Sequence, residues 1–175
     1  MTQPPGTLYF PIWAVRTDDA GNDQPGYWHN NLWYPVGAYL APYRGVSNNT
    51  QAFPGSANIN TYVSLPTPLA ADVSLAGAES WLCLSVLSAY VDTVNNNTEV
   101  ALALNVTGAT SIPAGSRPEA RLHLLGKTPI AVTVSHQTTD ILGPGISHVE
   151  LMAAGNACNL SNVAFSVTPL AALRP

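Results

Sequence analysis

The last two-thirds of the chain repeat a two-residue alternation of apolar with polar or small side chains, and this feature constrains the fold most. In residues 100–107, four aliphatic residues alternate with alanine, asparagine and threonine. A period of two places one apolar row on one face of a β-strand. The same pattern predicts further strands at residues 120–124, 130–135, 148–153 and 163–168.

Turn-forming residues separate these predicted strands. The run Asn95–Asn97 is predicted to form a hairpin turn, because asparagine tolerates left-handed backbone conformations. Residues 143–145 and 155–156, which contain glycine, are predicted to close other strands. No segment shows a convincing helical period. Short strands at regular spacing, joined by turns, indicate an all-β antiparallel sandwich or barrel.

The segment 81–91 is apolar on both of its faces. A helix is the competing interpretation, but the β-branched Val86 and Val91 and the neighbouring strand patterns weigh against it. A strand with two apolar faces must be covered on both sides. Because one sandwich covers only one side, we expect a second subunit on the other. The expected interface residues are Trp81, Leu84, Val86 and Tyr90.

The first third of the chain has a different composition. Ten of the 14 aromatic residues lie between residues 9 and 53, and proline and glycine interrupt the same segment at short intervals. The spacing of the prolines excludes a regular helix there. The sequence therefore predicts an extended, loop-rich N-terminal arm of residues 1–58, followed by a β-sandwich domain of residues 59–175.

The aromatic residues of this arm have three interpretations. They are core residues, anchors on another protein, where Trp and Tyr are enriched, or flat surfaces on which sugar rings stack. A segment broken so often by proline makes few backbone hydrogen bonds of its own, which favours a docking role. The expected partner-binding residues are Tyr9, Phe10, Trp13, Trp28, Trp33, Tyr34, Tyr39 and Tyr43.

The composition excludes several classes of protein. Charged residues make up 9% of the chain, against about 25% in ordinary soluble proteins. Lys127 is the single lysine and there is no basic cluster, so a nucleic-acid partner bound through charge is excluded. No apolar run approaches the roughly 18 residues of a membrane span. The N-terminus lacks the basic and apolar regions of a signal peptide.

Sequence motifs for catalysis are absent. The chain has no G-x-S-x-G, G-x-x-x-x-G-K-[ST], G-x-G-x-x-G or H-E-x-x-H motif, so we expect neither an enzyme nor a cofactor. The four histidines are not at metal-ligand spacing, and we expect His123 and His148 on the polar faces of strands. A hydrolase that pairs two distant carboxylates remains a third interpretation.

Two other groups of residues invite a functional interpretation. Asp18, Asp19 and Asp23 lie around a glycine, as in calcium loops, but the terminal bidentate glutamate is missing. We expect a solvated loop and no metal. Cys83 and Cys158 lie among apolar residues and are expected to be buried thiols, with a single bridge between them left open.

The order of segments between Ala78 and Leu170 carries a resemblance. A strand at 79–86 leads through a turn to a strand at 99–108, and the chain ends with segments at 148–151 and 162–167. This order resembles the jelly roll of the tumour-necrosis-factor and complement-head superfamily, which recurs in phage virion proteins. The resemblance implies a homotrimer of jelly rolls about a threefold axis. In phages, such trimers look like capsid decoration or spike proteins.

These observations lead to one expected function. The chain is expected to be a virion accessory protein, made in the host cytoplasm, that decorates or cements a capsid. It would bind the major capsid protein of the same virion as a trimer, with the aromatic arm as the adhesive segment. The alternative is a receptor- or glycan-binding module of a phage tail fibre or spike.

Overall fold

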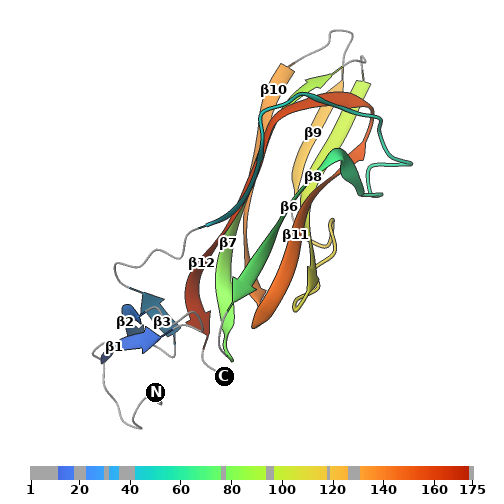
Figure 1. Ribbon diagram of the computed structural model, residues 1–175. Coiled ribbons are helices and arrows are strands. Elements are labelled where there is room, and N and C mark those ends of the chain that lie inside the picture. The colour runs from blue at the N-terminus through green and yellow to red at the C-terminus, as the bar shows by residue number, and fades with distance from the viewer. Residues whose placement is uncertain are drawn as a thin grey trace.

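The computed structural model describes residues 12–17, 23–29, 32–35, 42–75, 78–93, 97–117, 119–125 and 131–173. These residues form twelve strands and no helix, and the strand pairs are antiparallel. Two sheets pack face to face in an elongated sandwich (Figure 1). The predicted all-β antiparallel jelly-roll sandwich is therefore confirmed.

The larger sheet, sheet A, follows the order β1-β2-β3-β12-β7-β10, and β4 and β5 also pair with β12. The smaller sheet, sheet B, follows the order β6-β11-β8-β9. Sheet A consists of β1 (Ile12–Thr17), β2 (Asp23–His29), β3 (Leu32–Pro35), β4 (Tyr43–Ser47), β5 (Gln51–Phe53), β7 (Ser80–Thr93), β10 (Ala131–Leu142) and β12 (Cys158–Leu173). Sheet B consists of β6 (Val63–Leu75), β8 (Asn97–Gly108), β9 (Ala120–Leu125) and β11 (Gly145–Gly155).

The apolar rows predicted from the alternation meet between the two sheets. Odd-numbered residues of β7 and the even-numbered residues 98–106 of β8 are buried, as a two-residue period requires, and the small Ala101 and Ala103 of β8 are buried as well. This single core joins both sheets. Its largest fully buried side chains are Phe53, Leu65, Val73, Val91, Val100, Leu102, Leu142, Val149, Leu151, Leu160 and Val163.

The last strand, β12, organises sheet A. One of its edges pairs with β7 along most of its length, while its other edge pairs in turn with β5, β4 and β3. The register with β7 shifts between Ser161 and Ala164 and again between Pro169 and Ala171. Asn162 lies in the first shift with a φ of 48°, a left-handed conformation that asparagine tolerates. The shifts separate the stretches of β12 that pair with successive N-terminal strands.

Gly45 of β4 allows that strand to pass over the core. It pairs with Phe165 of β12. A Cβ atom at position 45 would lie 2.4 Å from the Phe165 ring and 2.9 Å from Leu69 Cγ. A larger residue would therefore displace the ring.

The predicted hairpin turn at residues 95–97 is wrong. The strand before it, β7, lies in sheet A, and the strand after it, β8, lies in sheet B. The connection therefore crosses between the sheets. Asparagine indicates a turn, but it does not determine whether the flanking strands pair with each other.

The expected boundary at residue 58 falls within the sandwich as the structure describes it. Strands β4 and β5 belong to the expected arm, yet both pair with β12. Phe53 is 1% exposed and lies in the core. The part of the arm up to residue 35 also contains regular strands, because β1, β2 and β3 pair in a meander. The described part of the arm thus contains five strands, β1 to β5.

Candidate interaction surfaces

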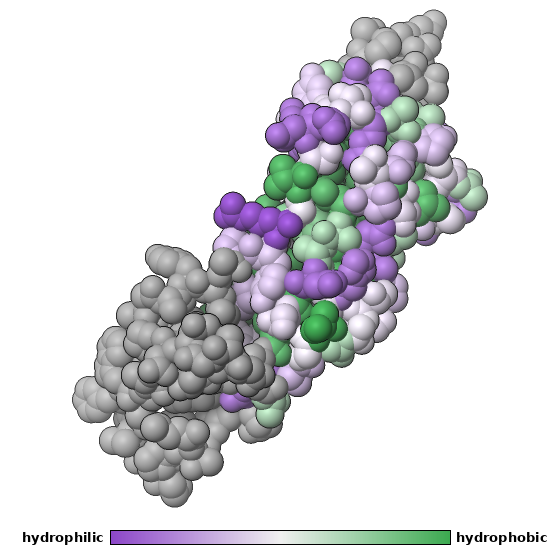
Figure 2. Space-filling model, viewed as in Figure 1, coloured by the Kyte–Doolittle hydropathy of each residue, from purple (hydrophilic) through white to green (hydrophobic). Residues whose placement is uncertain are grey.

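The side of sheet A that faces away from sheet B is the first candidate surface, which we call the outer face of sheet A. It is formed by even-numbered residues of β4 and β7, odd-numbered residues of β10, and the residues of β12 that pair with them. Of the five large hydrophobic residues that are exposed among the described residues, Val46, Tyr90 and Ile141 lie here and Leu170 lies in the second register shift of β12. Figure 2 shows one face of the molecule, on which green hydrophobic patches lie between purple hydrophilic ones.

Charge is sparse on this face. Among the outward residues of β4, β7, β10 and β12, only Arg44 and Asp92 are charged. The others are aliphatic residues, alanine, Tyr90, and residues with hydroxyl or amide groups. Charged residues are depleted in the core of protein contacts, so a sheet face with little charge is suited to such a contact.

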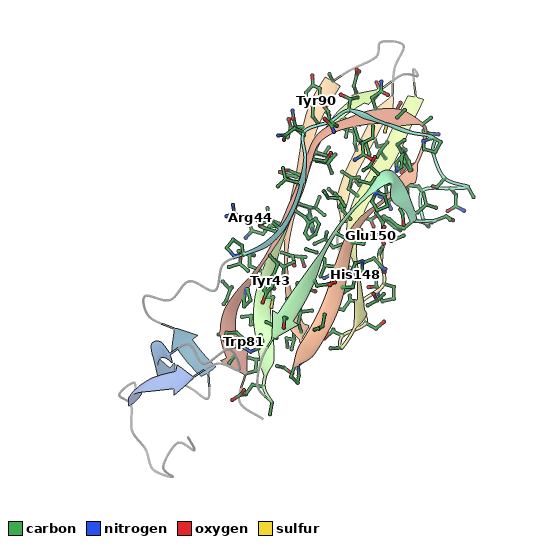
Figure 3. The ribbon with its side chains drawn as sticks, viewed as in Figure 1. Tyr43, Arg44, Trp81, Tyr90, His148 and Glu150 are labelled. Atoms are coloured by element: carbon green, nitrogen blue, oxygen red, sulfur yellow. The ribbon has the colours of Figure 1, made fainter. Side chains whose placement is uncertain are left out.

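The expected subunit interface needs one correction. Leu84, Val86 and Tyr90 lie on the outer face of sheet A, where Leu84 and Val86 are half-buried. Trp81 has the opposite parity on β7, so its side chain faces sheet B and belongs to the core. Figure 3 shows Trp81 and Tyr90 near opposite ends of β7. Trp81 is therefore a core residue and does not belong to the expected interface.

The outer face of sheet B differs in charge. Glu99, Glu119, Arg121 and His123 lie at its β8–β9 side, where Arg121 is bound to Glu119 and lies 3.6 Å from Glu99. Tyr62 donates a hydrogen bond to Glu119. Burial and this carboxylate raise the pKa of the Tyr62 hydroxyl. These contacts attach the segment before β6 to the edge of sheet B.

A second polar group lies across β6 and β11. His148 Nδ1 is 2.8 Å from Asp72 Oδ1, and both side chains are exposed. Glu150 follows on the same strand, and Figure 3 shows His148 and Glu150 beside each other. His123 and His148 thus lie on the polar face, as expected. In the described part of the chain, no three acidic, histidine or cysteine side chains are grouped as metal ligands.

The N-terminal meander is the second candidate surface. Its registers place Ile12, Trp28 and Trp33 in one row across β1, β2 and β3. The next row contains Trp13, Tyr27 and Tyr34. Neighbouring rows belong to opposite faces of a sheet, so both faces of this thin sheet carry aromatic positions. The sequence suggested an aromatic cluster, but only the registers divide it into two rows.

The other expected partner-binding residues have different positions. Tyr9, Phe10 and Tyr39 lie outside the described residues, as do Asp18 and Asp19. Tyr43 packs against the core, and its hydroxyl donates a hydrogen bond to the Ser74 carbonyl of sheet B. Burial raises the pKa of this hydroxyl. Tyr43 therefore joins the two sheets instead of forming part of a free docking surface.

The two cysteines are free, buried and far apart. Cys158 pairs with Thr93 at one end of β7, and Cys83 lies ten residues away on the same strand. Ten residues of strand span roughly 33 Å, whereas bridged cysteines have Cα atoms less than about 7 Å apart. A disulfide between them is excluded in this fold. Burial raises the pKa of each thiol to about 12.

No helix in the described residues could cross a membrane. No protein-family model and no curated protein sequence matches the chain. Among solved structures, the chain is similar to an Eiger tumour necrosis factor from S. frugiperda, with 10% sequence identity and a TM-score of 0.54. The match covers 76% of this chain and 94% of the other. At this identity the likeness shows the fold alone, a jelly-roll sandwich of the tumour-necrosis-factor type.

Proposed function

We propose that this protein is a structural accessory protein of a virion, which assembles as a homotrimer and attaches to the major capsid protein. The observation that carries the proposal is the nearly uncharged outer face of sheet A, with exposed aliphatic residues on a sheet whose other face is already buried. Such a surface binds by burial and hydrogen bonding and needs little electrostatic attraction. No catalytic step, cofactor, nucleic acid or membrane has a part in this function.

The first step of the proposal is self-association through the outer face of sheet A. Val46 and Ile141 are 59% and 56% exposed in the isolated chain. Burying the exposed part of each side chain contributes roughly 1–1.5 kcal/mol, about half of the value for full burial. A second copy is the proposed cover, because the superfamily that the fold resembles is built of trimers about a threefold axis. Three identical contacts then close into a ring.

The second step is attachment of the trimer through the N-terminal meander. Its two rows of aromatic positions are the proposed contact with a coat protein, because Trp and Tyr are the usual anchors of protein contacts. The meander joins the sandwich through two residue pairs between β3 and the end of β12. In Figure 1 it lies beyond the sandwich at this end. Three meanders per trimer strengthen attachment through multivalency.

One pair of variants tests self-association. Ile141→Lys places a charge on the outer face of sheet A, whereas Ile146→Lys places one on β11 of sheet B. The two side chains are similarly exposed, at 56% and 61%. We expect light scattering to give a trimer for the wild type and Ile146→Lys, and a monomer near 18.4 kDa for Ile141→Lys. A wild-type monomer that also fails to form trimers on particles would contradict the proposal.

Attachment is tested by co-sedimentation with empty capsids. We expect the wild-type trimer to sediment with the particles and a variant lacking the aromatic residues of the meander to remain in the supernatant. The alternative function, glycan binding, has support in the neighbouring positions of Trp28 and Trp33 on adjacent strands, since aromatic rings stack on sugars. A glycan-array signal that Trp33→Ala abolishes, without capsid binding, would favour this alternative.

A further inference from the structure

The side of the sandwich beside β10 contains an unusual concentration of polar groups between the sheets. Along β10, the residues that face sheet B include His136, Thr138 and Asp140. The first two pair with Leu87 and Ser85 of β7, and Ser85 is itself buried. Most other buried residues that the structure describes are apolar, and the buried polar ones away from β10 are Gln51, Thr93, Thr98 and Ser147. Buried polar groups need hydrogen-bond partners. The partners of the polar side chains beside β10 therefore have to be identified.

A small cavity lies among these residues. It offers about 10 Å³ of room for the centre of a water molecule. That volume corresponds to about one water and no more. Its polar lining comes from β7, from β10 and from the segment that links β8 to β9: Ser85, Arg117, His136 and Thr138.

The segment 109–117 closes this cavity on one side. Arg117 forms an ion pair with Asp140, and its Nη2 donates a hydrogen bond of 2.8 Å to the Leu104 carbonyl. Asn105 Oδ1 accepts a bond from the Ala114 amide at 3.2 Å. Both members of the ion pair are largely buried, with side chains 14% and 7% exposed. The charge of Arg117 is therefore balanced within the protein.

One polar atom at the cavity is left without a partner. His136 Nε2 is buried and makes no hydrogen bond to the described residues. A ring nitrogen of this kind either donates or accepts, depending on the tautomer. The hydroxyl groups of Ser85 and Thr138 line the same cavity and can do either. A single small molecule at the centre would give His136 Nε2 a partner and lie beside the two hydroxyl-bearing residues.

We infer that this cavity is a binding site for one structural water, which bridges His136 Nε2 and the hydroxyls of Ser85 and Thr138. The charge balance of Arg117 and Asp140 favours a neutral molecule over an anion or cation. The volume of the cavity fits a single water molecule. The water links Ser85 of β7 to His136 and Thr138 of β10 beneath the 109–117 segment. It thereby supplies the hydrogen-bond partner that His136 Nε2 lacks. This site is independent of the proposed assembly and attachment.

The direct test is a high-resolution crystal structure of the full chain. We expect one density peak at hydrogen-bond distance, about 2.7–3.2 Å, from His136 Nε2 and at least one hydroxyl. Crystals soaked in bromide or rubidium should show no anomalous signal there. An anomalous peak would make the site an ion site and overturn the inference. So would an empty cavity, or His136 Nε2 bonded directly to a protein atom.

Variants give a second test with matched controls. Ser85→Val fills the cavity and should remove the peak, whereas Ser88→Val alters the outer face of the same strand and should retain it. Thr138→Val keeps the side-chain volume but removes one bond to the water. Magnetic relaxation of the water nuclei measures how long the water stays bound. We expect Thr138→Val to shorten this residence time roughly tenfold relative to the wild type, as loss of one hydrogen bond implies. Thr139→Val, on the outer face, should leave that time unchanged. Equal effects of Thr138→Val and Thr139→Val would contradict the inference.

Discussion

Trp81 and Tyr90 lie on the same strand, β7, but their side chains face opposite sides of sheet A. Trp81 is 5% exposed and packs in the core, whereas Tyr90 is 37% exposed on the outer face. They differ in parity, and successive positions of a strand point to opposite faces. Both the odd-numbered and the even-numbered positions of β7 carry apolar residues. The odd-numbered ones lie in the core of the subunit, and the even-numbered ones lie at the proposed contact with another subunit.

This difference predicts opposite effects of two alanine substitutions. Trp81→Ala removes a large buried ring and is expected to lower the free energy of unfolding by about 3–5 kcal/mol. Tyr90→Ala is expected to change it by less than about 1 kcal/mol in dilute solution, but to weaken trimer formation. Urea denaturation and light scattering measure the two effects. Equal losses of stability in both variants would contradict the assignment of faces.

A second prediction concerns Gly45 and Phe165. Gly45→Ala is expected to destabilise the protein by about 1–3 kcal/mol, because the new Cβ atom overlaps the Phe165 ring. Adding Phe165→Leu removes the obstructing ring, so the two changes should be less damaging together than their sum. A double-mutant cycle measures this coupling. Strict additivity would mean that the loss arises elsewhere in β4.

The buried thiols predict a dependence of stability on alkaline pH. Burial raises the pKa of Cys83 and Cys158 from 9.0 to about 12. Above about pH 9 the unfolded chain releases these protons while the folded protein retains them, so stability falls as pH rises toward 12. Below pH 9 both states hold the protons, and the thiols contribute no slope. Denaturation at several pH values measures the effect.

The control for the thiols is the double variant Cys83→Ala/Cys158→Ala. It should start from a lower stability because of the smaller side chains, yet lose less of that stability between about pH 9 and 12. Native Cys83 and Cys158 should also react slowly with thiol reagents near neutral pH, because little thiolate is present. Rapid labelling of either thiol in the native protein would contradict their buried state.

Two truncations separate the arm from the sandwich. Deletion of residues 1–41 removes β1–β3 and leaves every strand of the core in place, so we expect a folded protein that no longer sediments with capsids. Deletion of residues 1–58 also removes β4, β5 and the buried Phe53. The longer truncation should be markedly less stable or insoluble. Thermal melting and co-sedimentation distinguish these outcomes.

The truncations also test the role of the meander. If the protein lacking residues 1–41 folds and still occupies particles at the wild-type level, the adhesive surface lies on the sandwich. If this shorter truncation does not fold, the meander contributes to the core. Either result would contradict the docking role proposed for β1–β3.

Metal removal gives the final prediction. Because the candidate ligands are few and not at ligand spacing, the chelator EDTA is expected to leave the melting temperature unchanged. A drop of several degrees that added calcium reverses would contradict this expectation. Asp18, Asp19 and Asp23 would then be the first residues to substitute, with the exposed Asp72 as a control.

The local pattern of side chains was sufficient to predict most of the sandwich. The alternation in residues 100–107 is that of β8, and the segments at 148–153 and 163–168 lie within β11 and β12. Such predictions succeed because a two-residue period is a property of each strand by itself. The segment 81–91 shows no such alternation, and its β-branched residues and the neighbouring strand patterns predict it as a strand instead. The aromatic arm was visible from composition, but its cross-strand rows were not.

Only the tertiary structure decided which strands pair and which face each residue serves. In the tertiary structure β7 and β8 lie in different sheets, and β4 and β5 pair with β12. Trp81 lies in the core and Tyr43 packs against it, so neither belongs to the contact expected for it. The tertiary structure separated the two cysteines along β7 and brought Arg117 to Asp140 beside a cavity. These features depend on contacts between residues far apart in the chain, and the period of a strand carries no information about its partners. The sequence by itself determined the strands and their apolar rows, whereas long-range pairing decided what each row covers.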